Sequence, residues 1–195
     1  MAEGAALAAG VQIRVASLIS RPRDIPPEWA EDAYRAGEAL ALGLDIALAA
    51  AGLKRTQLIA QRANRVAFAE TWTPPHGWAD FETLVRDMDA GAGRFPHLLD
   101  HAHAPWYYVP REFSQPLMLP EPQPQSHAGD LPRRTLSVGS VSALARELEA
   151  LEPLLIAAGH DPEQYFPAPL LEATAISLET GLVITLEPAP AATPT

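Results

Sequence analysis

The chain has 195 residues and a mass of 20.9 kDa, and 48% of its residues are hydrophobic, so it can build the core of one folded domain. Acidic residues outnumber lysine and arginine by 24 to 14, and the formal net charge of -10 argues against nucleic acid as a partner, because phosphate binding depends on clustered Lys and Arg. The absence of cysteine excludes disulfides, iron–sulfur clusters, cysteine-rich zinc sites and thiol catalysis.

The first quarter of the chain predicts a strand and then a long helix. Residues 11–18 alternate apolar and polar side chains with a period of two, as in a half-buried strand. Pro27 suits a first helical turn, and from Trp29 onward apolar residues recur every three or four positions. We expect this helix to extend toward Gly52, a C-cap, with Gly43 as a candidate break.

The following segment predicts a second strand, a loop and a shorter helix. Residues 65–70 alternate in polarity and indicate a strand, whereas residues 56–64 leave helix and strand open. The prolines and glycine of residues 73–77 predict a loop. Asp80 is a candidate N-cap for a helix that ends at Gly91.

Aromatic and β-branched residues at 106–109 predict a strand that Pro110 ends, and residues 117–119 suit a short edge strand. Residues 120–134 contain four prolines and few side chains suited to a core, so we expect a surface loop or a disordered excursion.

The clearest helical pattern begins at Ser140, a candidate N-cap, and Pro153 is expected to kink or end it. A second helix is expected over residues 169–180 with Gly181 as its cap, and a final strand over residues 182–187. The helix that begins at Ser140 has an apolar stripe, which consists of Val141, Leu144, Leu148, Leu151 and Leu155.

These elements predict a single α+β domain over residues 11–187, with helices packed on a small mixed or antiparallel sheet. We expect a flexible N-terminus at residues 1–10, a proline-rich loop at residues 120–134 and a disordered tail at residues 188–195. Residues 1–10 contain no basic residue, unlike a signal peptide, and no apolar run approaches about 20 residues, so a cytoplasmic location is expected.

Three of the six histidines fall between residues 97 and 103. On a helix, His97 and His101 would share one face at a spacing that suits Zn²⁺, with Asp100 and His103 as neighbouring donors. Zinc normally takes three or four protein ligands, and adjacent helical positions point about 100° apart. We therefore predict no bound metal and no cofactor, and keep a metal site of His97, His101 and His103 as the alternative.

Exposed aromatic residues on loops often bind partners, and two tryptophans flank the Pro-Pro-His-Gly loop. The other interpretation is that the tryptophans belong to the core. The acidic clusters around Glu31 and Glu149, the second of which includes Glu147, are interpreted as solvated helix faces. The candidate partner-binding residues are Trp72, His76, Trp78, His101, His103 and Trp106.

Two stretches of the chain, Phe95–His101 and Tyr107–Phe113, resemble a family of uncharacterised bacterial proteins that read approximately "HLLNHSDCDGYYVPVDF". In that family a variable loop and a "GSS…LLxELexL" helix follow, to which residues 138–151 are similar. The chain departs from the pattern at residues 102–105, where Ala-His-Ala-Pro replaces polar residues. Some members resemble small acidic immunity proteins, so the resemblance implies protein binding.

We therefore expect a non-enzymatic, acidic protein-binding domain of an immunity or accessory type, whose partner is another protein of basic character. Nucleic acid and membranes are not expected as partners, and self-association is left open. Two alternatives remain: a metal-binding or hydrolytic enzyme that uses the three histidines, and a structural subunit of a larger assembly.

Overall fold

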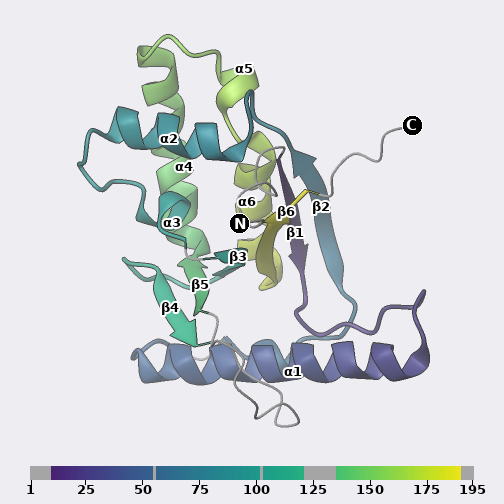
Figure 1. Ribbon diagram of the computed structural model, residues 1–195. Coiled ribbons are helices and arrows are strands. Elements are labelled where there is room, and N and C mark those ends of the chain that lie inside the picture. Colours follow the sequence, from purple (N-terminus) through teal and green to yellow (C-terminus); the bar gives the residue numbers. More distant parts are fainter. Residues whose placement is uncertain (1–9, 55, 102, 121–134, 190–195) are drawn as a thin grey trace.

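The structure is a computed structural model that describes residues 10–54, 56–101, 103–120 and 135–189 (Figure 1). The expected flexible N-terminus, proline-rich loop and disordered tail lie almost entirely outside these described residues.

A six-stranded mixed sheet organises the described part of the chain, in the order β2-β1-β6-β3-β5-β4. The pair formed by β3 and β5 is parallel, and the other neighbouring pairs are antiparallel. The predicted α+β class with helices on a small mixed sheet is confirmed. The strands are β1 (Val11–Ala16), β2 (Val66–Trp72), β3 (His103–Val109), β4 (Leu117–Pro120), β5 (Thr135–Ser140) and β6 (Val183–Pro188).

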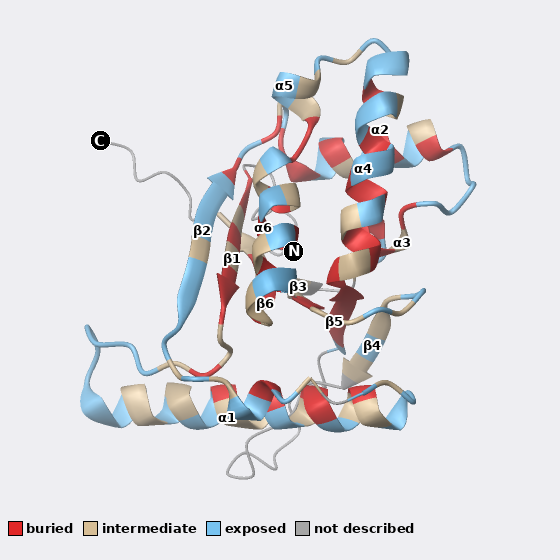
Figure 2. Cartoon of the chain, turned by 180° about the vertical axis from the view of Figure 1, so that it is seen from behind, coloured by how far each residue is buried: buried red, intermediate tan, exposed pale blue. Residues whose placement is uncertain are grey.

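Helices cover the sheet in two places (Figures 1 and 2). The long helix α1 crosses one end of the sheet, whereas α4 and α6 lie side by side against the strands and contact each other. The helices are α1 (Pro27–Ala50), α2 (Trp78–Asp89), α3 (Pro96–Leu99), α4 (Val141–Ala157), α5 (Pro162–Tyr165) and α6 (Ala168–Thr180), with a 3₁₀ turn η1 (Leu58–Ala60). Among the described residues, no helix is long and apolar enough to cross a membrane.

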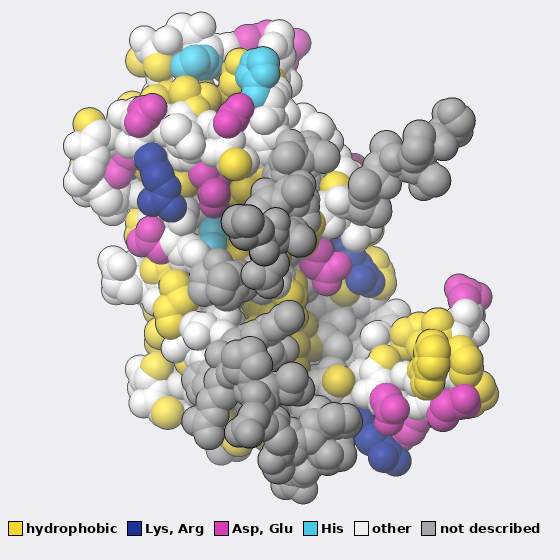
Figure 3. Space-filling model, viewed as in Figure 1, with side chains coloured by type: hydrophobic (Ala, Val, Ile, Leu, Met, Phe, Trp, Pro, Cys, Tyr) yellow, Lys and Arg dark blue, Asp and Glu magenta, His cyan; other side chains and the backbone are white. Residues whose placement is uncertain are grey.

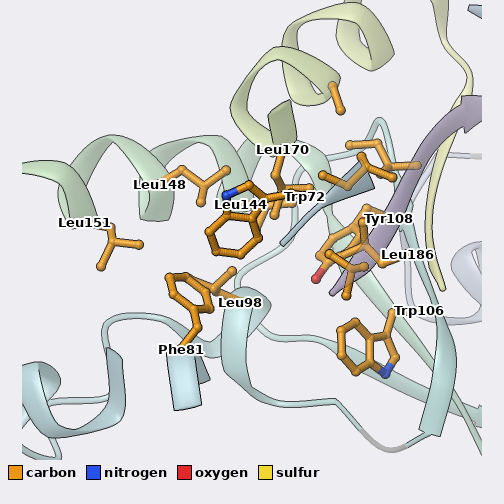
Figure 4. Packing of buried hydrophobic residues seen from close by; sticks show 14 of the residues in the cluster. Trp72, Phe81, Leu98, Trp106, Tyr108, Leu144, Leu148, Leu151, Leu170 and Leu186 are labelled. Carbon is orange, nitrogen blue, oxygen red and sulfur yellow. The ribbon is translucent and has the colours of Figure 1, made fainter. Parts of the chain in front are cut away.

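The larger hydrophobic cluster joins the sheet to α4 and α6 (Figure 4). Ile13 and Val15 point into it from β1, because alternate side chains of a strand face the same side. The leucine stripe of α4 fills the other side, and Leu144, Leu148 and Leu151 are fully buried. A second cluster, around Leu44 and Leu48 of α1, closes the end of the sheet.

Most elements match their sequence-based prediction, and the differences have local reasons. Ser140 caps α4 as predicted, because its Oγ accepts the N–H of Ala143. Pro153 does not end α4, which continues to Ala157; the proline lies on the exposed face, where water can bind the carbonyl group that it leaves unpaired. Gly43 does not break α1, because the neighbouring Leu44 is buried and holds the helix on the core. Asp80 lies inside the first turn of α2, whose N-cap is Gly77.

Candidate functional site

The three tryptophans proposed as partner contacts are core residues. Trp72, Trp78 and Trp106 are 8%, 0% and 4% exposed, so a partner cannot reach their rings. They form one aromatic cluster with Phe81, in which the ring centres of Trp78 and Trp106 are 5.4 Å apart. The loop before α2 is therefore anchored to the core by the buried tryptophans on either side of it.

The remaining members of the proposed partner surface differ in exposure and position. His76 is exposed in the loop before α2. His101 is half-buried, and its ring stacks on Trp106 at a centre-to-centre distance of 4.3 Å. His103 lies at the start of β3, and the placement of its side chain is outside the described part.

The pair His97 and His101 does not share a helix face, because α3 ends at Leu99. His97 is buried, and its Nδ1 accepts the backbone N–H of Ser140 at 3.0 Å. Nε2 of His101 lies 2.9 Å from both the Leu98 carbonyl oxygen and the Tyr108 hydroxyl. Among the described residues, no group of three or more His, Asp or Glu side chains is arranged to hold a metal ion.

Burial lowers the pKa of both histidines. Desolvation lowers the pKa of His101 to about 4, although the Leu98 carbonyl opposes this change. Desolvation also lowers the pKa of His97, and the carbonyl groups of Phe113 and Ser114 offset part of that change. Nε2 of His97 nevertheless forms no hydrogen bond with the described residues. Both imidazoles are therefore neutral at pH 7.

Glu147 is not part of a solvated helix face, as the sequence had suggested, but is 7% exposed. Its Oε1 accepts the N–H of His97 at 3.0 Å, and its Oε2 accepts the N–H of Leu98 at 2.8 Å. Desolvation raises the pKa of Glu147 to about 7, although the two N–H donors favour the charged form. Glu147 follows Leu144 by three positions and precedes Leu151 by four, so its place on the apolar stripe was a signal in the sequence.

The residues that carry the family-like pattern meet around α3. The Tyr108 hydroxyl donates to the His97 carbonyl at 2.9 Å, and Glu147 and Ser140 bind the same residue from α4 and its N-cap. Gly139 is required next to them, because a Cβ atom there would overlap the Tyr108 ring. The pattern therefore describes an internal network that holds α3 against the sheet and α4.

A pocket of about 330 Å³ opens beside this network, between α3 and α4. Arg94 and Arg146 are the cations that line it. Arg94 binds Asp89 at 2.8 Å, and Arg146 forms a two-pronged ion pair with Glu112. Both guanidinium groups are thus already neutralised by carboxylates of the chain.

The most distinctive surface feature is negative charge on the C-terminal helices, which the sequence interpretation overlooked. Residues 147–195 contain eight acidic residues and no lysine or arginine, whereas residues 1–146 contain 16 acidic and 14 basic residues. Glu147 is the buried member of the eight. Six of the others are exposed on α4, on α6 and around α5, and we call them the acidic helical surface: Glu149, Glu152, Asp161, Glu163, Glu172 and Glu179.

The three helices that carry the acidic helical surface are neighbours, since α4 contacts both α5 and α6. Exposed residues run along α4 and α6 on the side seen in Figure 2. No lysine or arginine follows Arg146 in the chain, so α5 and α6 carry no cation, and the one cation on α4, Arg146, forms an ion pair with Glu112. Such a surface creates a negative potential that attracts and orients a positively charged partner.

Comparison with known proteins gives one match. The model of a family described as "Putative DNA-mimic protein" matches residues 14–186. No curated protein matches the chain, and no solved structure matches it.

Proposed function

The chain belongs to the family of that description, and from this membership we propose that it occupies the DNA-binding surface of another protein by presenting carboxylates in place of phosphates. Its partner is then a DNA-binding protein, and its action is binding without catalysis. An immunity-type or accessory role is a narrower form of the same proposal, as is action in the cytoplasm.

Family membership corrects our expectation about partners, which set nucleic acid aside because the chain is acidic. Excess negative charge does argue against direct contact with phosphates. It does not argue against a role in protein–DNA recognition, because an acidic surface competes for the same Lys and Arg side chains as DNA. The expectation was wrong because it considered nucleic acid only as a ligand.

The observation that carries the proposal is the acidic helical surface on α4, α5 and α6, together with the absence of lysine and arginine from the 49 residues 147–195. The helices hold the carboxylates on a packed scaffold, which lowers the entropy lost on binding. The basic surface of a DNA-binding protein would therefore meet an ordered array of carboxylates, which carry negative charge as phosphates do.

Helix geometry arranges these carboxylates in two rows. Glu172 and Glu179 are seven residues apart on α6, which is two turns and a rise of about 10.5 Å. Glu149 and Glu152, three residues apart on α4, add a second row on the neighbouring helix.

The experiment compares two triple variants with the same change in charge. One replaces Glu149, Glu172 and Glu179 by Gln. The matched control replaces Glu70 by Gln and Asp80 and Asp87 by Asn, which are exposed acidic residues on β2 and α2. Both variants have a formal charge of -7. Immobilised wild-type protein is incubated with an extract of its host and eluted with duplex DNA, and the released proteins are purified.

We expect the released proteins to bind duplex DNA in gel-shift assays and wild-type chain to displace that DNA. The variant of the acidic helical surface should compete at least tenfold less well, whereas the control should stay within about twofold of wild type. Raising the ionic strength should slow the association, because steering by charge is screened. Release of no protein by duplex DNA, or equal competition by both variants, would refute the proposal.

A further inference from the structure

Trp29 is the most exposed large hydrophobic residue in the described part of the chain, at 63%. The helical periodicity had suggested an apolar face beginning at this residue. In the structure, the N-terminal end of α1 extends past the edge of the sheet, so its first turn has no core to pack against (Figure 1). Figure 3 shows apolar and acidic side chains gathered at that end of α1. An exposed tryptophan is a typical binding hot spot.

The segment that presents Trp29 is held in place by side-chain contacts. Arg21 binds Glu31 at 2.9 Å, and its guanidinium carbon lies 4.3 Å from the centre of the Tyr34 ring. Arg35 contacts the same Glu31 from the next turn of the helix, at 3.4 Å. These contacts tie the residues before α1 to the helix, so Trp29 is presented on a pre-formed surface.

Unpaired carboxylates lie next to Trp29. Glu28 and Asp32 are exposed, form no ion pair in the described part of the chain, and are four residues apart on α1. Two like charges at this spacing repel each other, which a cation placed between them would relieve. Glu31 engages both Arg21 and Arg35, so the two arginines bound next to this site are already paired with a carboxylate.

We propose that Trp29, Glu28 and Asp32 form a docking point for an arginine side chain on the basic surface of the partner. A guanidinium group can lie flat on the indole ring while its N–H groups donate to a neighbouring carboxylate. Exposed carboxylates beside an aromatic ring complement such a group in charge and shape. This inference rests on the proposed function, because it assigns a contact to the same kind of partner, and it adds a second contact region at the far end of the molecule from α5.

The test uses two nine-residue peptides as probes, one of arginine and one of lysine, titrated into ¹⁵N-labelled protein. Loss of one signal in Trp29→Phe assigns the indole N–H of Trp29 among the four tryptophans. We expect that signal to shift with the arginine peptide, while the signals of the three buried indoles stay in place. Affinity for the arginine peptide should fall about two- to fivefold in Trp29→Ala and in Glu28→Gln/Asp32→Asn.

Ile46→Ala is the matched control, because Ile46 is an apolar residue on the same helix, is 56% exposed and does not belong to the proposed docking point. It should bind the arginine peptide like wild type, and the lysine peptide should be less sensitive to Trp29→Ala than the arginine peptide. Equal affinities of Trp29→Ala and Ile46→Ala, with no shift of the Trp29 signal, would overturn the inference.

The two proposals can fail separately. If duplex DNA releases a partner that the acidic helical surface binds but Trp29→Ala competes like wild type, the docking point is wrong and the proposed function stands. If the peptide result holds but duplex DNA releases no protein, the proposed function is wrong and the arginine site remains.

Discussion

Oε1 of Glu147 lies 3.0 Å from the backbone nitrogen of His97, although 50 residues separate the two along the chain. The carboxylate joins α4 to α3 and replaces water as the partner of two N–H groups at the start of a short helix. The histidine that looked like a metal ligand is therefore an anchoring point of the fold. Its ring and backbone are bound by α4, β3 and the N-cap of α4.

The first prediction concerns pH. Folding raises the pKa of Glu147 from 4.5 to about 7, so the folded protein keeps a proton that the unfolded chain releases. This contribution to stability is complete below pH 4.5 and is lost as the pH rises to about 7. In urea unfolding, the stability of wild type relative to Glu147→Gln should fall over this range, by up to about 1.4 kcal/mol per pH unit.

Glu149→Gln, two positions away and exposed, should follow the pH profile of wild type. The histidines act in the opposite sense, since the lowered pKa of His101 removes stability as the pH falls from 6.5 toward 4. All three proteins contain the same histidines, so the contribution of these residues to the pH dependence of stability cancels in the comparison. Parallel profiles for wild type and Glu147→Gln would contradict the assignment.

The second prediction concerns the leucine stripe of α4. Leu148 is fully buried in the larger cluster, so Leu148→Ala should lower the free energy of unfolding by about 2–5 kcal/mol. Ile156→Ala, at a site 58% exposed on the same helix, should change it by less than about 0.5 kcal/mol. Denaturant melts measure both, and similar values for the two variants would mean that the stripe does not pack on the sheet.

The third prediction concerns Asp45, a buried carboxylate in α1. It accepts the Thr56 hydroxyl at 2.6 Å and the N–H groups of Leu58 and Ile59 at 3.2 and 3.1 Å. Asp45→Ala should destabilise the protein by about 1–3 kcal/mol, because it leaves the buried N–H of Leu58 and two half-buried donors unpaired. Amide hydrogen exchange should accelerate at Leu58 and Ile59, and unchanged exchange there would show that these bonds are not formed in solution.

The fourth prediction is that the histidines bind no metal. The Nδ1 lone pair of His97 is taken by the Ser140 N–H, and Nε2 of His101 faces two hydrogen-bonding groups. Protein purified without a histidine tag should contain no stoichiometric zinc, and zinc titration should give the same heat for wild type and His101→Ala. One equivalent of zinc that is lost in His97→Ala or His101→Ala would reverse this prediction and favour the enzyme alternative.

Local patterns were enough to predict most elements. The strand at Val11–Ala16, the helix that begins after Ser140 and the last helix with its Gly181 cap follow from periodicity and capping, which depend on a few adjacent residues. The strand β5 was not predicted. The proline-rich segment before it has no strand pattern, and its parallel pairing with β3 joins residues that are far apart in the sequence.

The candidate site, like the fold, was predictable from the sequence only in part. The sequence by itself determined the charge imbalance, since residues 147–195 contain no lysine or arginine, and no fold could have changed that. Only the tertiary structure decided which side chains reach the surface. It buried Trp72, Trp78 and Glu147 and left Trp29 in solvent, because the exposure of a residue depends on which distant elements pack over it and not on its neighbours in the chain.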